Sequence, residues 1–539
     1  MTRPWLKASQ EVEDQLEIPL VSLYSILEKS AGTYSDKVAI IYEDHSLTYK
    51  ELFQKVNKLA ESFKSLGMKK GETIGLMLSN HPNYIISFYA AQALGLIVVQ
   101  VNPRYTPREL VQIVSNSEMK QLIVEADSLD TVTQVQFLHS IDQVIITGNS
   151  VRSNEHDGYF SLEELMEEGE NKVQHTRINV QEDVAVIQYT GGTTGKMKGA
   201  MLTHYNLVAN VVQSRVMYGE KMLEGNERIL TAIPLYHVYA MTASMNLGIY
   251  IGATIILLKQ FEINLALDTI KKYQPTFLPG VPRIYTSFVL HPEVEKYRLD
   301  CLKFCSSGSA PLPIEIINKF EKLTGAVIGE GFGMSEASPS THRNPTVGIR
   351  KIGSVGIPLP GTDSKIIDDD NNELPSRCVG ELVIKGPQIM KGYLNNEKET
   401  NHALRNGWLY TGDLAMMDDD GYFYIVGRKK EMIINGGFNV YPQEVENVLY
   451  EHQDVREAAV VGIPHEEKGE MIKAFIVLKE GTQADTEEIR GFCYRNLTNY
   501  KVPNFFEIVS ELPRNTVGKL LKRKLVESEL AKHTRKDAL

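Results

Sequence analysis

Cysteine is scarce in this sequence, and the few that occur show no pattern of a metal site or a disulfide framework. The four among 539 residues are Cys301, Cys305, Cys378 and Cys493. None belongs to a C-x-x-C pair, and none lies beside the histidine spacing of a zinc site. The sequence therefore predicts reduced thiols, as is typical of a cytosolic protein.

Long basic runs and an apolar leader are also lacking. The formal net charge is -11 and the pI is about 5.7, and basic segments such as 428–430 are short. Nucleic-acid-binding proteins gather Lys and Arg on one face, so we expect no nucleic-acid partner. Residues 1–7 lack the apolar core of a signal peptide. A cytoplasmic location is therefore favoured over secretion.

One uncharged run, residues 84–101, meets the length of a membrane span. Pro82 precedes an amphipathic pattern that ends before Gly95, and residues 96–99 form a β-branched run that is typical of a buried parallel strand. Glutamines such as Gln100 are ill suited to lipid. We predict a buried helix and strand here, and no transmembrane segment.

The stretch 189–199 reads Tyr-Thr-Gly-Gly-Thr-Thr-Gly-Lys-Met-Lys-Gly, and it dominates the motif content of the chain. It follows the apolar run 184–187 and precedes a helical pattern that begins near Thr203. Glycines let backbone N–H groups turn inward, threonine hydroxyls add donors, and lysines add positive charge. A loop of this composition suits a polyphosphate.

Two other interpretations of this loop are open. A Walker A loop would need glycine where Thr190 stands, and a Ser or Thr hydroxyl for magnesium where Met197 stands. A glycine- and threonine-rich surface turn is the remaining alternative for any short motif taken alone. Further motifs along the chain disfavour it.

The stretch resembles the phosphate loop of the adenylate-forming superfamily, which includes acyl-CoA synthetases, luciferases and peptide-synthetase adenylation domains. That pattern is roughly Y-T-S-G-T-T-G-x-P-K-G. Here Gly191 replaces serine, which removes one phosphate donor, and Met197 replaces proline, which leaves the loop exit less rigid. The resemblance implies metal contact by Thr194 and ATP contacts by Thr190, Gly191, Gly192, Thr193, Thr194, Gly195 and Lys198.

Segment 234–240 is similar to the P-L-[FY]-H motif of the same family. A lone histidine is more often structural than catalytic. The resemblance favours His237 as a catalytic gate or orienting donor near the acyl carboxylate and the phosphate. Segment 307–312 is similar to the adenine loop, which implies nucleotide contacts by Gly308, Ser309 and Ala310.

Segment 329–336 resembles the [YF]-G-x-[TS]-E element of the family. It does not fit the G-x-G-x-x-G fingerprint or the G-x-S-x-G elbow of hydrolases. The resemblance assigns Phe332 to adenine stacking, Ser335 to phosphate contact and Glu336 to magnesium, which prefers hard oxygen ligands. The implied nucleotide contacts are Gly331, Phe332, Gly333, Met334 and Ser335.

Segment 406–432 closely resembles the signature of fatty acyl-CoA synthetases. It contains the T-G-D motif, whose Asp413 is implied to accept hydrogen bonds from both ribose hydroxyls. An exposed Asp after glycine is otherwise a turn residue. The resemblance implies nucleotide contacts by Ile425 and Arg428. It also implies that Lys430 is the hinge of a mobile C-terminal domain.

Two glycines and one lysine complete the family pattern. Gly436 and Gly437 are implied to reach the CoA channel after the domain rotates. Segment 512–519 resembles the P-[RK]-[NT]-x-x-G-K tail, which implies that Lys519 bridges the substrate carboxylate and the α-phosphate of ATP.

The predicted fold class is α/β. Strand-like and helical runs alternate between residues 73 and 124, which indicates a mostly parallel sheet with helices on its faces. Glycine- and proline-rich alternation over 353–386 predicts a β subdomain. We expect a large N-terminal domain of layered α/β sheets plus that subdomain at residues 1–429, and a small mobile α+β domain at 430–539.

The resemblance implies that a fatty acid reacts with ATP, in the presence of Mg²⁺, to form an acyl-adenylate that passes to coenzyme A. An adenylating ligase for an aryl or medium-chain acid, or one that loads a carrier protein, is the runner-up. A non-catalytic acyl or nucleotide binder at a membrane surface is the alternative of another class. Acyl chain length, peripheral membrane contact and homodimer formation are left open.

Overall fold

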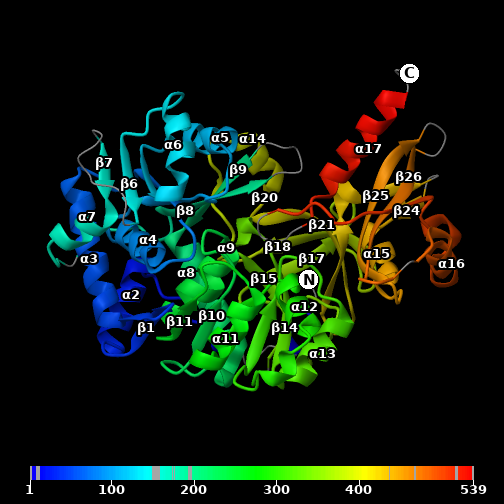
Figure 1. Ribbon diagram of the computed structural model, residues 1–539, viewed down its shortest axis with the longest axis horizontal. Coiled ribbons are helices and arrows are strands. Elements are labelled where there is room, and N and C mark those ends of the chain that lie inside the picture. Colours follow the sequence, from blue (N-terminus) through cyan, green and yellow to red (C-terminus); the bar gives the residue numbers. More distant parts are fainter. Residues whose placement is uncertain are drawn as a thin grey trace. The chain divides into compact units, whose positions relative to one another are not determined.

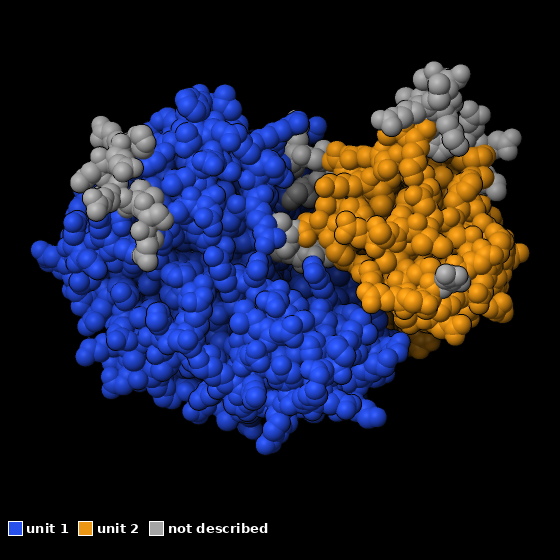
Figure 2. All heavy atoms as spheres, viewed as in Figure 1, with its two compact units in different colours: residues 1–363, 385–409 blue, residues 364–384, 410–539 orange. Residues whose placement is uncertain are grey.

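The chain forms two compact units (Figure 2). The computed structural model describes residues 3–7, 13–148, 158–172, 174, 176–191, 197–346, 348–435, 438–465, 469–482, 484–515 and 520–536. Unit 1 comprises residues 1–363 and 385–409, and unit 2 comprises residues 364–384 and 410–539. The boundary expected at residue 430 lies within unit 2, so that division into domains stays a prediction.

Unit 1 contains an eight-stranded sheet in the order β19-β9-β8-β4-β3-β5-β6-β7. From β8 to β7 all neighbours are parallel, as predicted, while β8–β9 and β9–β19 are antiparallel. The strands are β3 (Thr73–Met77), β4 (Ile97–Gln100), β5 (Gln121–Glu125), β6 (Gln143–Thr147), β7 (Tyr159–Ser161), β8 (Val184–Gly191), β9 (Met197–Thr203) and β19 (Gly392–Tyr393).

A nine-stranded sheet in the order β16-β15-β14-β13-β12-β10-β11-β1-β2 forms the second layer of this unit (Figure 1). It is parallel from β14 to β1, and antiparallel at both ends. The strands are β1 (Val38–Tyr42), β2 (His45–Thr48), β10 (Arg228–Thr231), β11 (Thr254–Leu257), β12 (Phe277–Gly280), β13 (Phe304–Ser307), β14 (Val327–Gly333), β15 (Ser340–Arg343) and β16 (Ile357–Pro358).

Helices cover these sheets, and local sequence signals set their ends. Thr48 caps α3 and Thr106 caps α5 in capping boxes with Glu51 and Glu109. The main helices are α2 (Leu23–Thr33), α3 (Tyr49–Ser65), α4 (Pro82–Leu94), α5 (Pro107–Ser117), α6 (Leu129–Gln136), α7 (Leu162–Glu168), α8 (His204–Tyr218), α10 (Leu247–Tyr250), α11 (Ile263–Tyr273), α12 (Pro282–Leu290), α13 (Ile314–Thr324) and α14 (Glu397–Ala403).

Helix α4 confirms the buried helix expected in the uncharged run, but the expected amphipathic pattern is wrong. It begins with Pro82 at its first turn and ends at Gly95, whose φ of 71° is left-handed, and β4 follows. Nearly all of its residues are buried. Among the described residues, the structure holds no helix long and apolar enough to cross a membrane.

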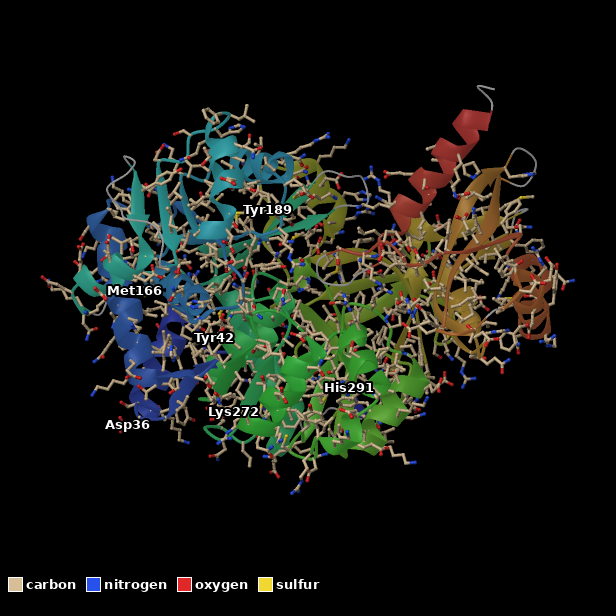
Figure 3. The ribbon with its side chains drawn as sticks, in the orientation of Figure 1. Asp36, Tyr42, Met166, Tyr189, Lys272 and His291 are labelled. Carbon is tan, nitrogen blue, oxygen red and sulfur yellow. The ribbon has the colours of Figure 1, made fainter. Side chains whose placement is uncertain are left out.

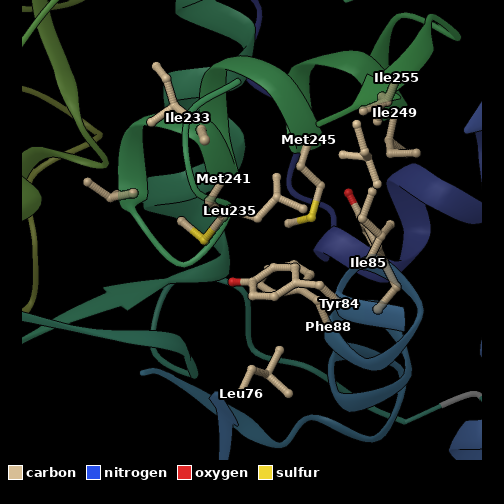
Figure 4. Close-up of a cluster of buried hydrophobic side chains, with 14 of the residues drawn as sticks. Leu76, Tyr84, Ile85, Phe88, Ile233, Leu235, Met241, Met245, Ile249 and Ile255 are labelled. Carbon is tan, nitrogen blue, oxygen red and sulfur yellow. The ribbon is translucent and has the colours of Figure 1, made fainter. Parts of the chain in front are cut away.

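The core of unit 1 joins the two sheets. Figure 4 shows Tyr84, Ile85 and Phe88 of α4 packed with Met241 and other side chains of the segment that follows β10. That segment passes through α9 (Val238–Ala240) and a π-helical turn, Met241–Asn246. One polar pair inside this core joins α4 to β4: the Tyr84 hydroxyl donates to Gln100.

Unit 2 holds most of one five-stranded sheet and all of another. The first has the order β17-β18-β21-β20, with β22 on β21, and the second has the order β24-β23-β26-β25, with β27 on β26. The elements are β17 (Asp363–Ile367), β18 (Val379–Lys385), β20 (Leu404–Arg405), β21 (Trp408–Met417), β22 (Phe423–Arg428), β23 (Ile433–Asn435), β24 (Phe438–Val440), α15 (Pro442–Tyr450), β25 (Val455–His465), β26 (Gly469–Leu478), α16 (Thr486–Asn496), β27 (Phe505–Ile508) and α17 (Lys522–Lys536).

Candidate functional site

The predicted phosphate loop joins two strands of a hairpin, not a strand and a helix. Thr190 pairs with Lys198, and Gly191 with Met197, across β8 and β9. Helix α8 begins only afterwards, at His204, with Thr203 as its cap. The helix expected near Thr203 is thus confirmed, but β9 between the loop and that helix was not predicted, because a glycine-rich exit followed by Ala-Met-Leu gives no clear strand period.

Close packing fixes the base of this hairpin. A side chain at Gly199 would begin 2.8 Å from Ile187 Cγ2 and 3.2 Å from the Tyr189 ring, so only glycine fits there. Tyr189, labelled in Figure 3, donates its hydroxyl hydrogen to Asn116 Oδ1 at 2.7 Å. The strand that enters the predicted loop is therefore anchored to α5.

Lys198 is a residue of the predicted loop whose side chain the structure places. Its ammonium forms an ion pair with Glu399 of α14 and lies 5.0 Å from the centre of the Tyr393 ring. The sequence pattern gave no signal for Glu399 or Tyr393, because both meet Lys198 only through the pairing of β19 with β9.

Glu336 lies in the same cluster. The Tyr393 hydroxyl donates to Glu336 Oε1 at 2.7 Å, and the carboxylate is buried. The structure thus brings together two residues that the sequence predicted for ATP and magnesium, Lys198 and Glu336, on either side of one tyrosine. A cation and an acidic oxygen ligand beside a glycine-rich hairpin suit a metal-bound polyphosphate.

The end of β14 carries the predicted adenine and phosphate contacts. A side chain on Gly333 would begin 2.3 Å from the Pro339 carbonyl oxygen, and one on Gly331 would begin 2.9 Å from that of His342. These glycines therefore permit the close pairing of β14 with β15. The ring of Phe332 lies 6.1 Å from that of His342, whose pKa burial lowers to about 3.

Met334 and Ser335 continue the chain beyond β14. The Met334 N–H donates to the Pro339 carbonyl oxygen at 2.9 Å, and Ser335 opens a short 3₁₀ turn, Ser335–Ala337, that carries Glu336. The predicted contact residues at this corner therefore share one tightly held segment.

The predicted adenine loop follows β13. Ser309 is exposed and has a left-handed φ of 72°, and Ala310 is exposed as well. Gly308 faces the Tyr239 ring, 3.6 Å from where its side chain would begin. The Tyr239 hydroxyl lies 2.7 Å from Ser306 Oγ, so this loop is joined to the segment that carries His237.

His237 lies at the N-terminus of α9, where its Nδ1 accepts the Tyr239 N–H at 3.2 Å. Because Nδ1 accepts, the neutral ring carries its hydrogen on Nε2. Asn80 holds the preceding segment: its Nδ2 donates to the carbonyl oxygens of Ile233 and Leu258, both at 3.0 Å, and its Oδ1 accepts from Leu235 N. The motif analysis missed Asn80.

Asp413 and Arg428 form the predicted ribose pair in unit 2. They are register partners of β21 and β22, and Arg428 Nε lies 2.9 Å from Asp413 Oδ1. The Asp413 carboxylate is buried. Ile425 lies on β22, and Lys430 is exposed in the short turn after it.

Several predicted residues lie outside the described residues. Their roles therefore stay predictions. They are Gly192, Thr193, Thr194, Gly195, Gly436, Gly437 and Lys519.

A family model described as AMP-binding enzyme matches residues 27–394, and one described as AMP-binding enzyme C-terminal domain matches residues 444–519. The chain belongs to the AMP-binding enzyme family. The first match lies within the expected N-terminal domain, residues 1–429, and the second lies within the expected C-terminal domain, residues 430–539.

Relatives agree with this assignment to the AMP-binding enzymes. The long-chain-fatty-acid-CoA ligase of Bacillus subtilis (strain 168) is 40% identical over 98% of this chain and 99% of its own. The anthranilate CoA ligase AuaEII in complex with anthranoyl-AMP superimposes with a TM-score of 0.88 at 26% identity, over 97% of this chain and 99% of that one. ATP-bound MatB from Rhodopseudomonas palustris gives 0.85 at 28% identity, over 94% and 98%.

Proposed function

We propose that this protein is an AMP-forming ligase that joins a fatty acid to coenzyme A. The observation that carries the proposal is the 40% identity, over 98% of the chain, to a long-chain-fatty-acid-CoA ligase. The cluster of Lys198, Tyr393 and Glu336 supports it, because it holds a cation for the phosphates beside a carboxylate that suits magnesium.

The reaction has two half-steps. A carboxylate oxygen of the acid attacks the α-phosphorus of ATP, the bond to the bridging oxygen breaks, and pyrophosphate leaves. The thiolate of coenzyme A then attacks the acyl carbon of the adenylate, and AMP leaves with the electron pair of the broken acyl–oxygen bond. Adenylation replaces a poor leaving group by a good one.

Charge control is the main task of unit 1 in the first half-step. Lys198 balances phosphate charge, and His237 orients the acyl carboxylate or the α-phosphate. Glu336 fits a magnesium site, because Mg²⁺ is often held by one or two carboxylates together with substrate phosphates. A bound Mg²⁺ would supply positive charge to those phosphates.

Unit 2 carries the residues that bind the ribose of the nucleotide. It also carries the catalytic groups that change between the two half-steps. Asp413 accepts from the ribose hydroxyls while Arg428 fixes its orientation. Lys519 bridges the carboxylate and the α-phosphate during adenylation. Rotation about Lys430 then replaces it by the Gly436-Gly437 segment at the CoA channel. Further parts of the proposal are a cytoplasmic location, peripheral membrane contact and a homodimer.

The test is AMP formation from ATP by the purified full-length protein with a panel of carboxylic acids. We expect AMP and pyrophosphate only when a fatty acid is present, and acyl-CoA when free coenzyme A is added. Turnover with an acyl carrier protein but not with coenzyme A would favour the carrier-loading alternative. An anthranilate-like acid as the best substrate would favour the aryl alternative. Absence of acid-dependent AMP formation would exclude the carrier-loading and aryl alternatives as well as the proposed function.

A further inference from the structure

Asn80 is a buried amide whose polar groups all bond to the backbone of other segments. Its relative exposure is 2%. Nδ2 donates to the carbonyl oxygens of Ile233 and Leu258, both at 3.0 Å. Oδ1 accepts the Leu235 N–H at 2.7 Å. A buried amide is costly unless its donors and its acceptor are paired, and here both hydrogens and the oxygen have partners.

These bonds join the two sheets of unit 1. Asn80 comes soon after β3 of the eight-stranded sheet. Ile233 comes soon after β10, and Leu258 directly follows β11, which is the parallel neighbour of β10 in the nine-stranded sheet. All three residues lie beyond the carboxyl ends of their strands, where open α/β sheets bind their ligands. The Asn80 amide therefore ties the two sheets together at that edge.

Asn80 is itself held by the residues on either side. The Ser79 N–H donates to Glu125 Oε1 at 2.7 Å, and the Ser79 hydroxyl donates to Oε2 at 3.2 Å. Glu125 is the last residue of β5. His81 caps α4, because its Nδ1 accepts the Asn83 N–H at 3.1 Å. A fixed backbone thus presents the amide, as a group that orients another residue requires.

The segment that Asn80 holds leads directly to His237. The side chains of Ile233 and Leu235 are buried. The His237 N–H donates to the Pro234 carbonyl oxygen at 3.0 Å, which closes a turn over residues 234–237. The bonds from Asn80 lie on either side of Pro234, at the start of this turn. The position of His237 therefore depends on the Asn80 amide.

We propose that Asn80 is a positioning residue for the adenylation half-step, in which it holds residues 233–235 so that His237 is aligned with the acyl carboxylate and the α-phosphate. The inference rests on the proposed function, because it adds a residue to the same site. Asn80 acts through His237 and not by its own contact with substrate. A displacement of about 1 Å at a reacting group can cost about a hundredfold in rate.

The test is a double-mutant cycle on the acid-dependent exchange of labelled pyrophosphate into ATP. Asn80→Ala, His237→Ala and the double variant are compared with the wild type. We expect each single variant to lower the maximal rate about tenfold or more, and the double variant to lose no more than His237→Ala. Losses that multiply in the double variant, or an unchanged rate in either single variant, overturn the inference.

A second readout separates positioning from loss of structure. Conversion of a supplied acyl-adenylate and coenzyme A to thioester should stay within about twofold of the wild-type rate in Asn80→Ala, since that step no longer needs the acid and the α-phosphate to be aligned. An equal loss in both half-reactions overturns the inference. Absence of acid-dependent exchange by the wild type with every acid instead overturns the proposed function.

Folding is controlled with two further variants. Asn80→Ala leaves three backbone groups without their partner and should lower the melting temperature. Asn80→Ser keeps a hydroxyl donor and acceptor, so it enters the same cycle with a smaller expected loss of rate and of stability. Asn57→Ala is the matched control, at an amide that is 1% exposed and accepts from the Tyr24 hydroxyl at 2.6 Å. It should lower the melting temperature and leave the exchange rate unchanged.

Discussion

Tyr393 links the two charged residues of the candidate site. Its hydroxyl donates to Glu336 at 2.7 Å, and its ring lies 5.0 Å from the Lys198 ammonium. One side chain therefore positions an acidic ligand and a cation by two different contacts. Glu399 holds the same lysine from the other direction, so in this structure Lys198 is already neutralised.

Glu399→Gln is expected to lower KM for ATP by about two- to tenfold, because the phosphates then no longer compete with a carboxylate for Lys198. The measurement is the ATP dependence of AMP formation at saturating acid. Glu397→Gln, at an exposed glutamate of the same helix, is the control and should leave KM unchanged. A raised KM in Glu399→Gln, with Glu397→Gln unaffected, would mean that Glu399 positions Lys198 for ATP.

Sequence patterns predicted the motif residues but not their partners. Each motif residue lies in a segment whose local order of residues indicates its function. These residues are Lys198, Glu336, His237 and Asp413. Neither Asn80 nor Tyr393 lies in such a segment, and their contacts arise from strand pairing and packing between distant parts of the chain. No local signal contains that information.

At the scale of elements, helix and strand ends with strong local signals were predicted well. Pro82 and Gly95 bracket α4, and the alternation from β3 to β5 gave the parallel sheet. Strand β9 was missed, because its register is set by antiparallel pairing with β8 rather than by its own pattern. The base of the phosphate loop is therefore a hairpin.

His204 joins two elements and gives a prediction for pH dependence. It is the first residue of α8, its Nδ1 accepts the Leu23 N–H of α2 at 3.3 Å, and burial lowers its pKa from 6.5 to about 4. Since the unfolded chain takes up a proton below pH 6.5 and the folded chain does not, this residue stabilises the fold fully above that pH. The stability is lost as the pH falls toward 4.

His204→Asn should therefore lose less stability than the wild type between pH 6.5 and 4, by up to about 3 kcal/mol in the free energy of unfolding. Asn is chosen because its amide oxygen can accept the same N–H. Chemical denaturation at a series of pH values measures the difference. Parallel pH profiles for the two proteins would show that His204 titrates normally in the folded state.

At the scale of the whole molecule, the chain combines a large unit built on two sheets with a unit that carries the C-terminal family region. Two half-reactions with different second substrates require the catalytic groups to change between steps. A hinge at Lys430 with Lys519 beyond it would meet that requirement. The account therefore predicts that loss of Lys519 separates the two half-reactions.

The most direct test of the central claim is exchange of labelled pyrophosphate into ATP without coenzyme A, in the wild type and in Lys519→Ala. We expect exchange by the wild type only when a fatty acid is present. We also expect a loss of about a hundredfold or more in the variant, which still converts a supplied acyl-adenylate and coenzyme A to thioester. No acid-dependent exchange by the wild type, or an equal loss of both half-reactions in Lys519→Ala, would contradict that claim.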